Sequence, residues 1–320
     1  MATDLVDDTQ VVVKRAVEAD LAEDVGARLE HEAEVLRRLS TASAPPVGGP
    51  ERPHERVIGL ACDGGCIYLV QPFVPGVTLA ELVSRGPLSP ASTLQVGIGV
   101  LSSLQHAHDH QVLHRDVKPA NVIVEQVDGG GDDGPTVGRA VLVDFGFALS
   151  SSLAPSLRDE RVGTVRYLAP EAAGLLSGAV DERSDLYSVG ILIFECLAGE
   201  PPFEGADVGT VLQQHLSAAV PRLGALGVDV PRALDAVVQR LLRKDPSERY
   251  QTAGAALADL SAIADGMERG VREPTVVIGL HDRGHALTEP AFVARDAELS
   301  RLAGLIGRAR ETRRGGLVLL

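Results

Sequence analysis

The chain has 320 residues, of which 45% are hydrophobic and 23% charged, so it can form a core and is not disordered throughout. Its formal net charge of −14 argues against nucleic acid or an anionic membrane surface as the main partner. Three cysteines are too few for a disulfide scaffold and favour a reducing, cytoplasmic location. The acidic N-terminus has no signal-peptide core, and no apolar run reaches the ~20 residues that a membrane-spanning helix needs.

The predicted elements change in character along the chain. The first part combines β-branched runs with stretches of helical periodicity. In chain order it predicts a strand over 10–16, a helix over 19–39, strands over 56–62 and 66–73, a helix over 90–110, and short strands up to 146. Beyond 171 the pattern is helical. A small strand-rich part followed by a larger helical part predicts an α+β fold of two lobes.

Three motifs carry the strongest chemical signal. The run HRDVKPAN occupies 114–121, DFG occupies 144–146, and APE occupies 169–171. In this order, between predicted strands and a helical lobe, they resemble the signature set of the protein kinase family, specifically bacterial Ser/Thr kinases of the eukaryotic-like type. The resemblance covers about residues 10–265. It implies the bilobal protein-kinase fold and transfer of the ATP γ-phosphate to Ser/Thr hydroxyls of protein substrates.

The resemblance also assigns the residues of the transfer step. Asp116 is expected to accept the proton of the substrate hydroxyl, and Lys118 to place a charge on the γ-phosphate. Asn121 and Asp144 carry the oxygen ligands that suit Mg²⁺, with Mn²⁺ as a second candidate. The expected cofactors are therefore ATP and a divalent cation.

The nucleotide pocket begins at Lys14, which follows a run of three valines and matches the family's strand lysine. Glu32 is its expected partner because the helical turns that follow are apolar; Glu34 is the alternative but points about 200° away around the helix. The resemblance places Gln71 at the gatekeeper position. The other residues expected to contact adenine are Pro72, Val74, Val12 and Ile123.

Regulatory and structural roles follow from the same resemblance. Arg115 is typical of activation by loop phosphorylation, since a guanidinium can pair with a phosphate. The candidate regulatory hydroxyls, which include sites for autophosphorylation, are Ser150, Ser151, Ser152, Ser156 and Thr164. A plain polar loop is the alternative interpretation of the serines. Glu171 is expected to pair with Arg249, and Asp185 to brace the catalytic loop; all three are interpreted as fold determinants.

One departure from the family pattern concerns the start of the chain. No glycine precedes Gly26, so the first two strands and the Gly-rich phosphate loop have no counterpart before Lys14. The small lobe, about 1–73, is therefore expected to be incomplete, and the large lobe to cover about 74–265. Three explanations of this departure are open. The chain starts late in a longer gene product, or residues 1–10 form a cover over the phosphates. In the third, the protein is a catalytically impaired, kinase-like scaffold or regulatory module.

The last part of the chain is expected to lie outside the kinase domain, which spans 1–265. Residues 266–290 are polar and irregular and predict a linker. Residues 291–320 weakly resemble the opening of signalling NTPase modules that follow kinase domains in large bacterial regulators. They are expected to begin such a second module or to form a tail helix that packs on the kinase domain.

Overall fold

The computed structural model describes residues 2–3, 10–17, 22–41, 58–63, 66–127, 136–145, 165–176 and 179–282. All of these belong to the first of two compact units, Met1–Asp282. The second unit, Arg283–Leu320, lies outside the described residues, and so does the expected second module at 291–320. None of the helices in the described ranges has the length and apolar character of a bilayer-spanning segment.

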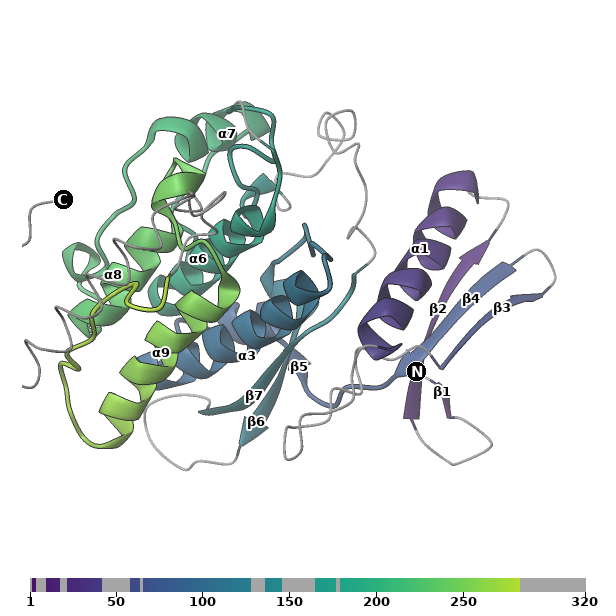
Figure 1. Ribbon diagram of the computed structural model, residues 1–320, viewed down its shortest axis with the longest axis horizontal. Coiled ribbons are helices and arrows are strands. Elements are labelled where there is room, and N and C mark those ends of the chain that lie inside the picture. The colour runs from purple at the N-terminus through teal and green to yellow at the C-terminus, as the bar shows by residue number, and fades with distance from the viewer. Residues whose placement is uncertain are drawn as a thin grey trace, which may run out of the picture. The chain divides into compact units, whose positions relative to one another are not determined.

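The small lobe is an antiparallel sheet with one long helix against it (Figure 1). Its elements are β1 (Ala2–Thr3), β2 (Gln10–Val17), α1 (Ala22–Thr41), β3 (Gly59–Asp63) and β4 (Cys66–Pro72). The strand order is β1-β2-β4-β3, and α1 packs on β2 and β4. Leu29 and Ala33 of α1 form a small buried cluster with Leu69 of β4. Apolar side chains at helical spacing therefore attach α1 to one face of the sheet.

The register of β2 and β4 decides which polar side chains share that face. Val12 lies opposite Gln71, and Lys14 lies opposite Leu69. Because side chains alternate between the faces of a sheet, these four residues point the same way. Leu69 packs against α1, so Lys14 and Gln71 are also directed towards this helix.

The large lobe contains a short sheet and a helical core. Its elements are β5 (Val77–Thr78), α2 (Leu79–Val83), α3 (Pro90–Asp109), η2 (Pro119–Asn121), β6 (Val122–Val127), β7 (Thr136–Leu142), α6 (Glu182–Ala198), α7 (Val208–Ser217), η3 (Leu223–Leu226), α8 (Arg232–Leu241), η4 (Pro246–Glu248) and α9 (Ala253–Glu268). The sheet order is β5-β6-β7. The helix α3 packs on β7, α6 and α9, and Figure 1 shows α9 lying alongside it.

Local sequence explains the central helices α3 and α6. The Ser89 hydroxyl caps α3 by accepting from the N–H of Ser92, and proline occupies the first helical position. A Cβ at Gly99 would overlap the carbonyl oxygen of Ala140, so this glycine allows α3 to approach β7 closely. The helix α6 is buried along almost its whole length and ends at Gly199, whose φ is 83°. An apolar α6 is therefore the centre of the core of this lobe.

A second buried cluster connects the two lobes. Val35, Leu36 and Leu39 of α1 pack with Ala107 and Val112 around Phe145. Ala107 belongs to α3, and Phe145 follows β7. The position of α1 is therefore coupled by apolar contact to the end of β7.

The two-lobed α+β architecture is confirmed, and the five elements for which bounds were predicted begin and end within about three residues of those bounds. The compact unit, however, continues past 265. The helix α9 runs to Glu268, and the segment 270–282, here called the strap, follows it. The strap is held by hydrogen bonds from Arg240 to Asp282 (2.6 Å), from the Gly279 N–H to Asp259 (2.7 Å) and from the Gln251 N–H to Asp282 (2.9 Å). The described part of the expected linker is thus attached to α8 and α9.

Backbone strain gives a prediction for Gln111, which follows α3 with a φ of 60°. A Cβ in this left-handed region is unfavourable, whereas glycine is not penalised there. We expect Gln111→Gly to raise the free energy of unfolding by about 0.5–1 kcal/mol, measured by urea denaturation. The matched control is Gln213→Gly at an exposed position inside α7. This change should lower the free energy of unfolding by about 1 kcal/mol. A loss of stability in Gln111→Gly would contradict the argument.

Candidate active site

The first group of the site joins the two lobes through Lys14. Its Nζ lies 2.5 Å from Oε1 of Glu32 and 3.2 Å from Oδ1 of Asp144. The alternative partner, Glu34, instead lies on the exposed face of α1, 3.4 Å from Nε of Arg38. The structure therefore brings together the lysine, glutamate and aspartate that the sequence singled out.

The Glu32 side chain is 3% exposed, whereas the Asp144 side chain is 44% exposed. Burial raises the pKa of Glu32 above its ordinary value, and the Lys14 ammonium and the Gln71 amide act in the opposite direction. A buried carboxylate keeps its charge only where such partners compensate for the lost water. The charge of Glu32 therefore depends on its contact with Lys14.

The second group lies in the catalytic loop, where three polar side chains converge. Lys118 Nζ lies 2.8 Å from Oδ1 and 2.7 Å from Oδ2 of Asp116. The turn η2 brings Asn121 back towards the same residue, and its Nδ2 donates to the Asp116 carbonyl (2.8 Å) and to Oδ2 (2.9 Å). The Asp116 carboxylate is thus oriented by one cation and one amide.

Asp185, in the first turn of α6, braces the backbone of this loop from inside the core. It accepts hydrogen bonds from the N–H groups of His114 (2.9 Å) and Arg115 (2.7 Å) and from Nε2 of His108 (2.9 Å). Burial alone would raise the pKa of Asp185, but the hydrogen bond from His108 and those from the backbone outweigh it and lower the pKa. Arg115 has a φ of 63°, so Asp185 supports a backbone conformation that is unfavourable by itself.

His114 connects the catalytic loop to the end of β7. Its Nε2 lies 3.2 Å from the Val143 carbonyl, and its Nδ1 lies 3.3 Å from the N–H of Asp116. The carbonyl can only accept and the N–H can only donate, so the ring is neutral with its proton on Nε2. Burial lowers the pKa of His114, which is consistent with this neutral form. The ring also meets Phe145 edge to face, with centroids 4.8 Å apart.

Asp144 and Asn121 provide the oxygen atoms that could hold a divalent cation. Asp144 has a φ of 70°, and the backbone N–H of Val143 next to it donates to the Asn121 carbonyl (2.8 Å). Both amide hydrogens of Asn121 are directed at Asp116, which leaves Oδ1 as its metal-binding atom. In the described ranges no cluster of three His, Cys, Asp or Glu side chains could hold a metal by itself. The oxygen atoms of Asp144 and Asn121 fit a hard divalent cation that takes most of its ligands from phosphate and water.

The residues expected around adenine lie at the junction of the lobes. Gln71 and Pro72 end β4, with Val12 directly opposite Gln71. Val74 follows in the connection to β5, and Ile123 lies on β6 opposite Thr78. Their contact with adenine stays a prediction.

The expected pair of Glu171 and Arg249 is fully buried. The guanidinium donates two hydrogen bonds to the carboxylate, of 2.7 Å and 2.8 Å, and Arg249 also donates to the Arg243 carbonyl. Burial tends to raise the pKa of Glu171, but the Arg249 guanidinium outweighs it and lowers the pKa. The pair connects residues 165–176 to α6 and to the residues that join η4 to α9.

One group of predicted residues is not tested by the structure, and one contact in the structure was not predicted. The regulatory candidates Ser150, Ser151, Ser152, Ser156 and Thr164 lie outside the described residues. Conversely, the bond from His108 to Asp185 was not predicted. Its signal in the sequence is weak, because several histidines stand close together near the end of α3.

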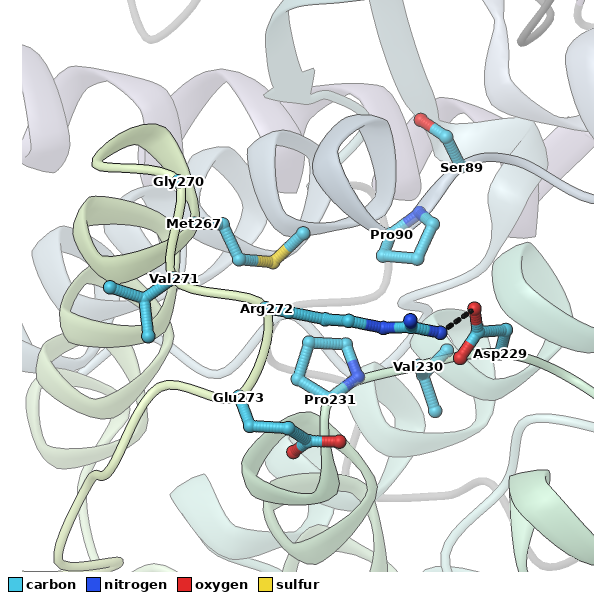
Figure 2. Close-up of a pocket in the computed structure, with 10 residues that line it drawn as sticks. All are labelled: Ser89, Pro90, Asp229, Val230, Pro231, Met267, Gly270, Val271, Arg272 and Glu273. Atoms are coloured by element: carbon cyan, nitrogen blue, oxygen red, sulfur yellow. Dashed lines mark hydrogen bonds and ion pairs between the residues drawn. The ribbon is translucent and has the colours of Figure 1, made fainter.

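A cavity of about 550 Å³ opens elsewhere, between the start of α3, the start of α8 and the strap. Figure 2 shows Arg272 extending across it towards Asp229. These two side chains are 83% and 84% exposed, and none of the lining residues belongs to the groups described above. The polar groups of this cavity are solvated, so it is not a candidate for the chemistry.

The family model described as the protein kinase domain matches residues 5–259. This chain belongs to the protein kinase family. It is 30% identical over 239 residues to the serine/threonine-protein kinase PrkC of Bacillus subtilis, covering 74% of this chain and 34% of that protein. It is 34% identical over 261 residues to the serine/threonine-protein kinase PknB of Mycolicibacterium smegmatis, covering 80% and 39%.

A further relative and a solved structure show the same similarity. The chain is 39% identical over 206 residues to the serine/threonine-protein kinase PknL of Mycobacterium tuberculosis, covering 63% of this chain and 48% of that protein. A crystal structure of Rad53 in complex with AMP-PNP shares the fold, with a TM-score of 0.57 and 23% identity, covering 78% of this chain and 57% of that one. The predicted family is therefore confirmed. The chain spans less than half the length of these curated relatives.

The buried pair of this kinase domain predicts an acid dependence of stability. Because the folded-state pKa of Glu171 lies below its ordinary value, the unfolded chain takes up the proton first as pH falls. The stabilisation is present at neutral pH and is lost below about pH 5. We expect the unfolding free energy of Glu171→Gln to be lower at pH 7 by about 3 kcal/mol and to fall less steeply from pH 6 to pH 4 than that of the unmodified protein.

Thermal and urea unfolding at several pH values measure this difference. The matched control is Glu200→Gln at an exposed position, which should keep the slope of the unmodified protein. Equal slopes for Glu171→Gln and the unmodified protein would contradict the assignment.

Proposed function

We propose that this chain is an active Ser/Thr protein kinase that transfers the γ-phosphate of ATP to hydroxyl groups of proteins. The observation that carries the proposal is the convergence of Lys118 and Asn121 on the Asp116 carboxylate, beside the Lys14–Asp144 contact. The hydrogen bond between Val143 and Asn121 links the two groups. The names of the relatives, which are serine/threonine-protein kinases, support Ser/Thr specificity.

In this proposal Asp116 accepts the proton of the attacking hydroxyl. Asn121 and Lys118 hold its carboxylate in place, so that the acceptor oxygen does not need to reorient during the reaction. Lys118 would place its charge near the transferred group, and Lys14 would neutralise the phosphates that remain on the nucleotide. Asn121 and Asp144 hold the divalent cation, which neutralises phosphate charge when it is bound.

The substrate class follows from the same loop. Lys118, two residues after Asp116, is the residue expected of the Ser/Thr branch of the family. Arg115 supports regulation by phosphorylation, with Ser150, Ser151, Ser152, Ser156 and Thr164 as candidate sites of autophosphorylation. A guanidinium beside a phosphorylated side chain would order this loop by charge-assisted hydrogen bonds.

The alternative, a catalytically impaired scaffold, is not favoured. Its support is the departure before Lys14, where the sequence offers no glycine for a phosphate-covering loop. Against it stand the aligned carboxylates, amide and ammonium groups, which a scaffold does not require. Binding of nucleotide without any transfer would identify the scaffold.

The first test of this function is transfer of labelled γ-phosphate to the chain itself and to a generic basic protein. We expect Asp116→Asn to reduce the rate about 10²–10⁴-fold because the general base is lost. Asp144→Asn should reduce it comparably because a cation ligand is lost. The matched control is Asp109→Asn at the exposed end of α3, which should leave the rate unchanged. Label in the unmodified protein that does not exceed that in Asp144→Asn would refute the proposal.

A second prediction concerns the metal. Removal of divalent cations with EDTA should abolish transfer, and Mg²⁺ should restore it, with Mn²⁺ as a weaker or comparable substitute. Asp144→Asn should raise the Mg²⁺ concentration needed for half-maximal rate by about tenfold, since one of two protein ligands loses its charge. Titration of the rate with each cation measures this shift. An unchanged half-saturation point would remove Asp144 from the cation site.

A further inference from the structure

Gln71 makes a contact that its predicted place beside adenine does not require. Its Nε2 lies 3.2 Å from Oε1 of Glu32, and the same oxygen lies 2.5 Å from Nζ of Lys14. An ionised carboxylate can only accept hydrogen bonds, so the amide nitrogen of Gln71, and not its oxygen, faces Glu32. One carboxylate oxygen therefore receives a donor from β4 and a donor from β2.

The sheet register makes this arrangement a property of the fold. Val12 faces Gln71 across the strand pair, and the face that carries Gln71 also carries Lys14. Glu32 approaches from α1, which is attached to the sheet by Leu29 and Ala33. Backbone pairing and apolar packing thus hold the two donors and the acceptor at fixed positions.

The environment of Glu32 makes the second donor significant. The Glu32 side chain is 3% exposed, so water compensates little of its charge. The charged groups that face it are Lys14 on β2 and Asp144 after β7, and Asp144 is itself in contact with Lys14. Gln71 is the neutral donor that binds Glu32 without competing for either of these charges.

We propose that Gln71 is a positioning residue whose side-chain amide holds the Glu32 carboxylate in the orientation that binds Lys14. Without this donor the carboxylate can rotate, and the ammonium of Lys14 loses its aligned partner. The role of Lys14 towards ATP rests on the proposed function. The contact of Gln71 with Glu32 and Lys14 does not, so it can be tested without nucleotide.

The chain offers a direct readout because it contains only three lysines, Lys14, Lys118 and Lys244. The folded protein is treated briefly with a small acetylating reagent, and acetylation of each lysine is followed by peptide mass spectrometry. In Gln71→Met we expect Lys14 to be acetylated about three- to tenfold faster, since a hydrogen bond to a charged group is lost and the ammonium is less well paired. Lys118 and Lys244 are internal references and should not change.

Glu32→Gln decides whether the effect passes through the carboxylate. In this background Gln71→Met should add nothing to the acetylation of Lys14, whereas a mere packing defect would add its full effect. Gln213→Met, at an exposed position on α7, is the matched control and should behave as the unmodified protein. Unchanged acetylation of Lys14 in folded Gln71→Met, or an equal increase in both backgrounds, would overturn the proposal.

Folding of each variant is checked by circular dichroism and thermal unfolding, and Gln71→Leu repeats the test with another apolar group. A further measurement avoids substitution at 71: Glu32→Gln should shift the side-chain amide resonance of Gln71, and an unshifted resonance would refute the contact. Affinity for a fluorescent ADP analogue, measured with Mg²⁺, should fall about three- to tenfold in Gln71→Met. If the unmodified protein binds no nucleotide, the proposed function fails while the acetylation result still decides the role of Gln71.

Discussion

The buried carboxylate of Asp185 is the constraint on which the catalytic loop depends. Burying an isolated charge is strongly unfavourable, and here two backbone N–H groups and the His108 ring provide the compensation. In return the carboxylate fixes the peptide units of His114 and Arg115, including the left-handed conformation of Arg115. The next residue, Asp116, is therefore held where its side chain meets Lys118 and Asn121.

The same constraint is passed on to the rest of the site by neutral hydrogen bonds. The His114 ring bridges the Val143 carbonyl and the Asp116 N–H, which only the neutral tautomer can do. Phe145 then packs against this ring and against the cluster that holds α1. The catalytic loop, the end of β7 and the helix α1 are thus connected by groups that carry no charge. In the proposed function this leaves the charged side chains to act on the nucleotide, the cation and the substrate.

Much of this arrangement was predictable from the sequence, because motif spacing reports which residues a family places together. The pairs formed by Lys14 with Glu32 and by Glu171 with Arg249 are examples. The contact of Gln71 with Glu32 was not predictable, since it depends on the exact register of two strands and on the height of a helix above them. The loop that carries the serine candidates lies outside the described residues, so those predictions stay predictions.

The strap shows that a segment predicted to be a linker can be attached to the folded domain, and this has a practical consequence. A linker was predicted here, yet Asp282 accepts a hydrogen bond from Arg240, whose guanidinium also lies over the Tyr250 ring, 4.6 Å from its centroid. Asp259 accepts from both the Tyr250 hydroxyl and the Gly279 N–H. A fragment cut where the family match ends, at 259, would remove half of α9 and expose these polar groups and the apolar surface beneath. For recombinant work a fragment of this compact unit should therefore extend at least to Asp282.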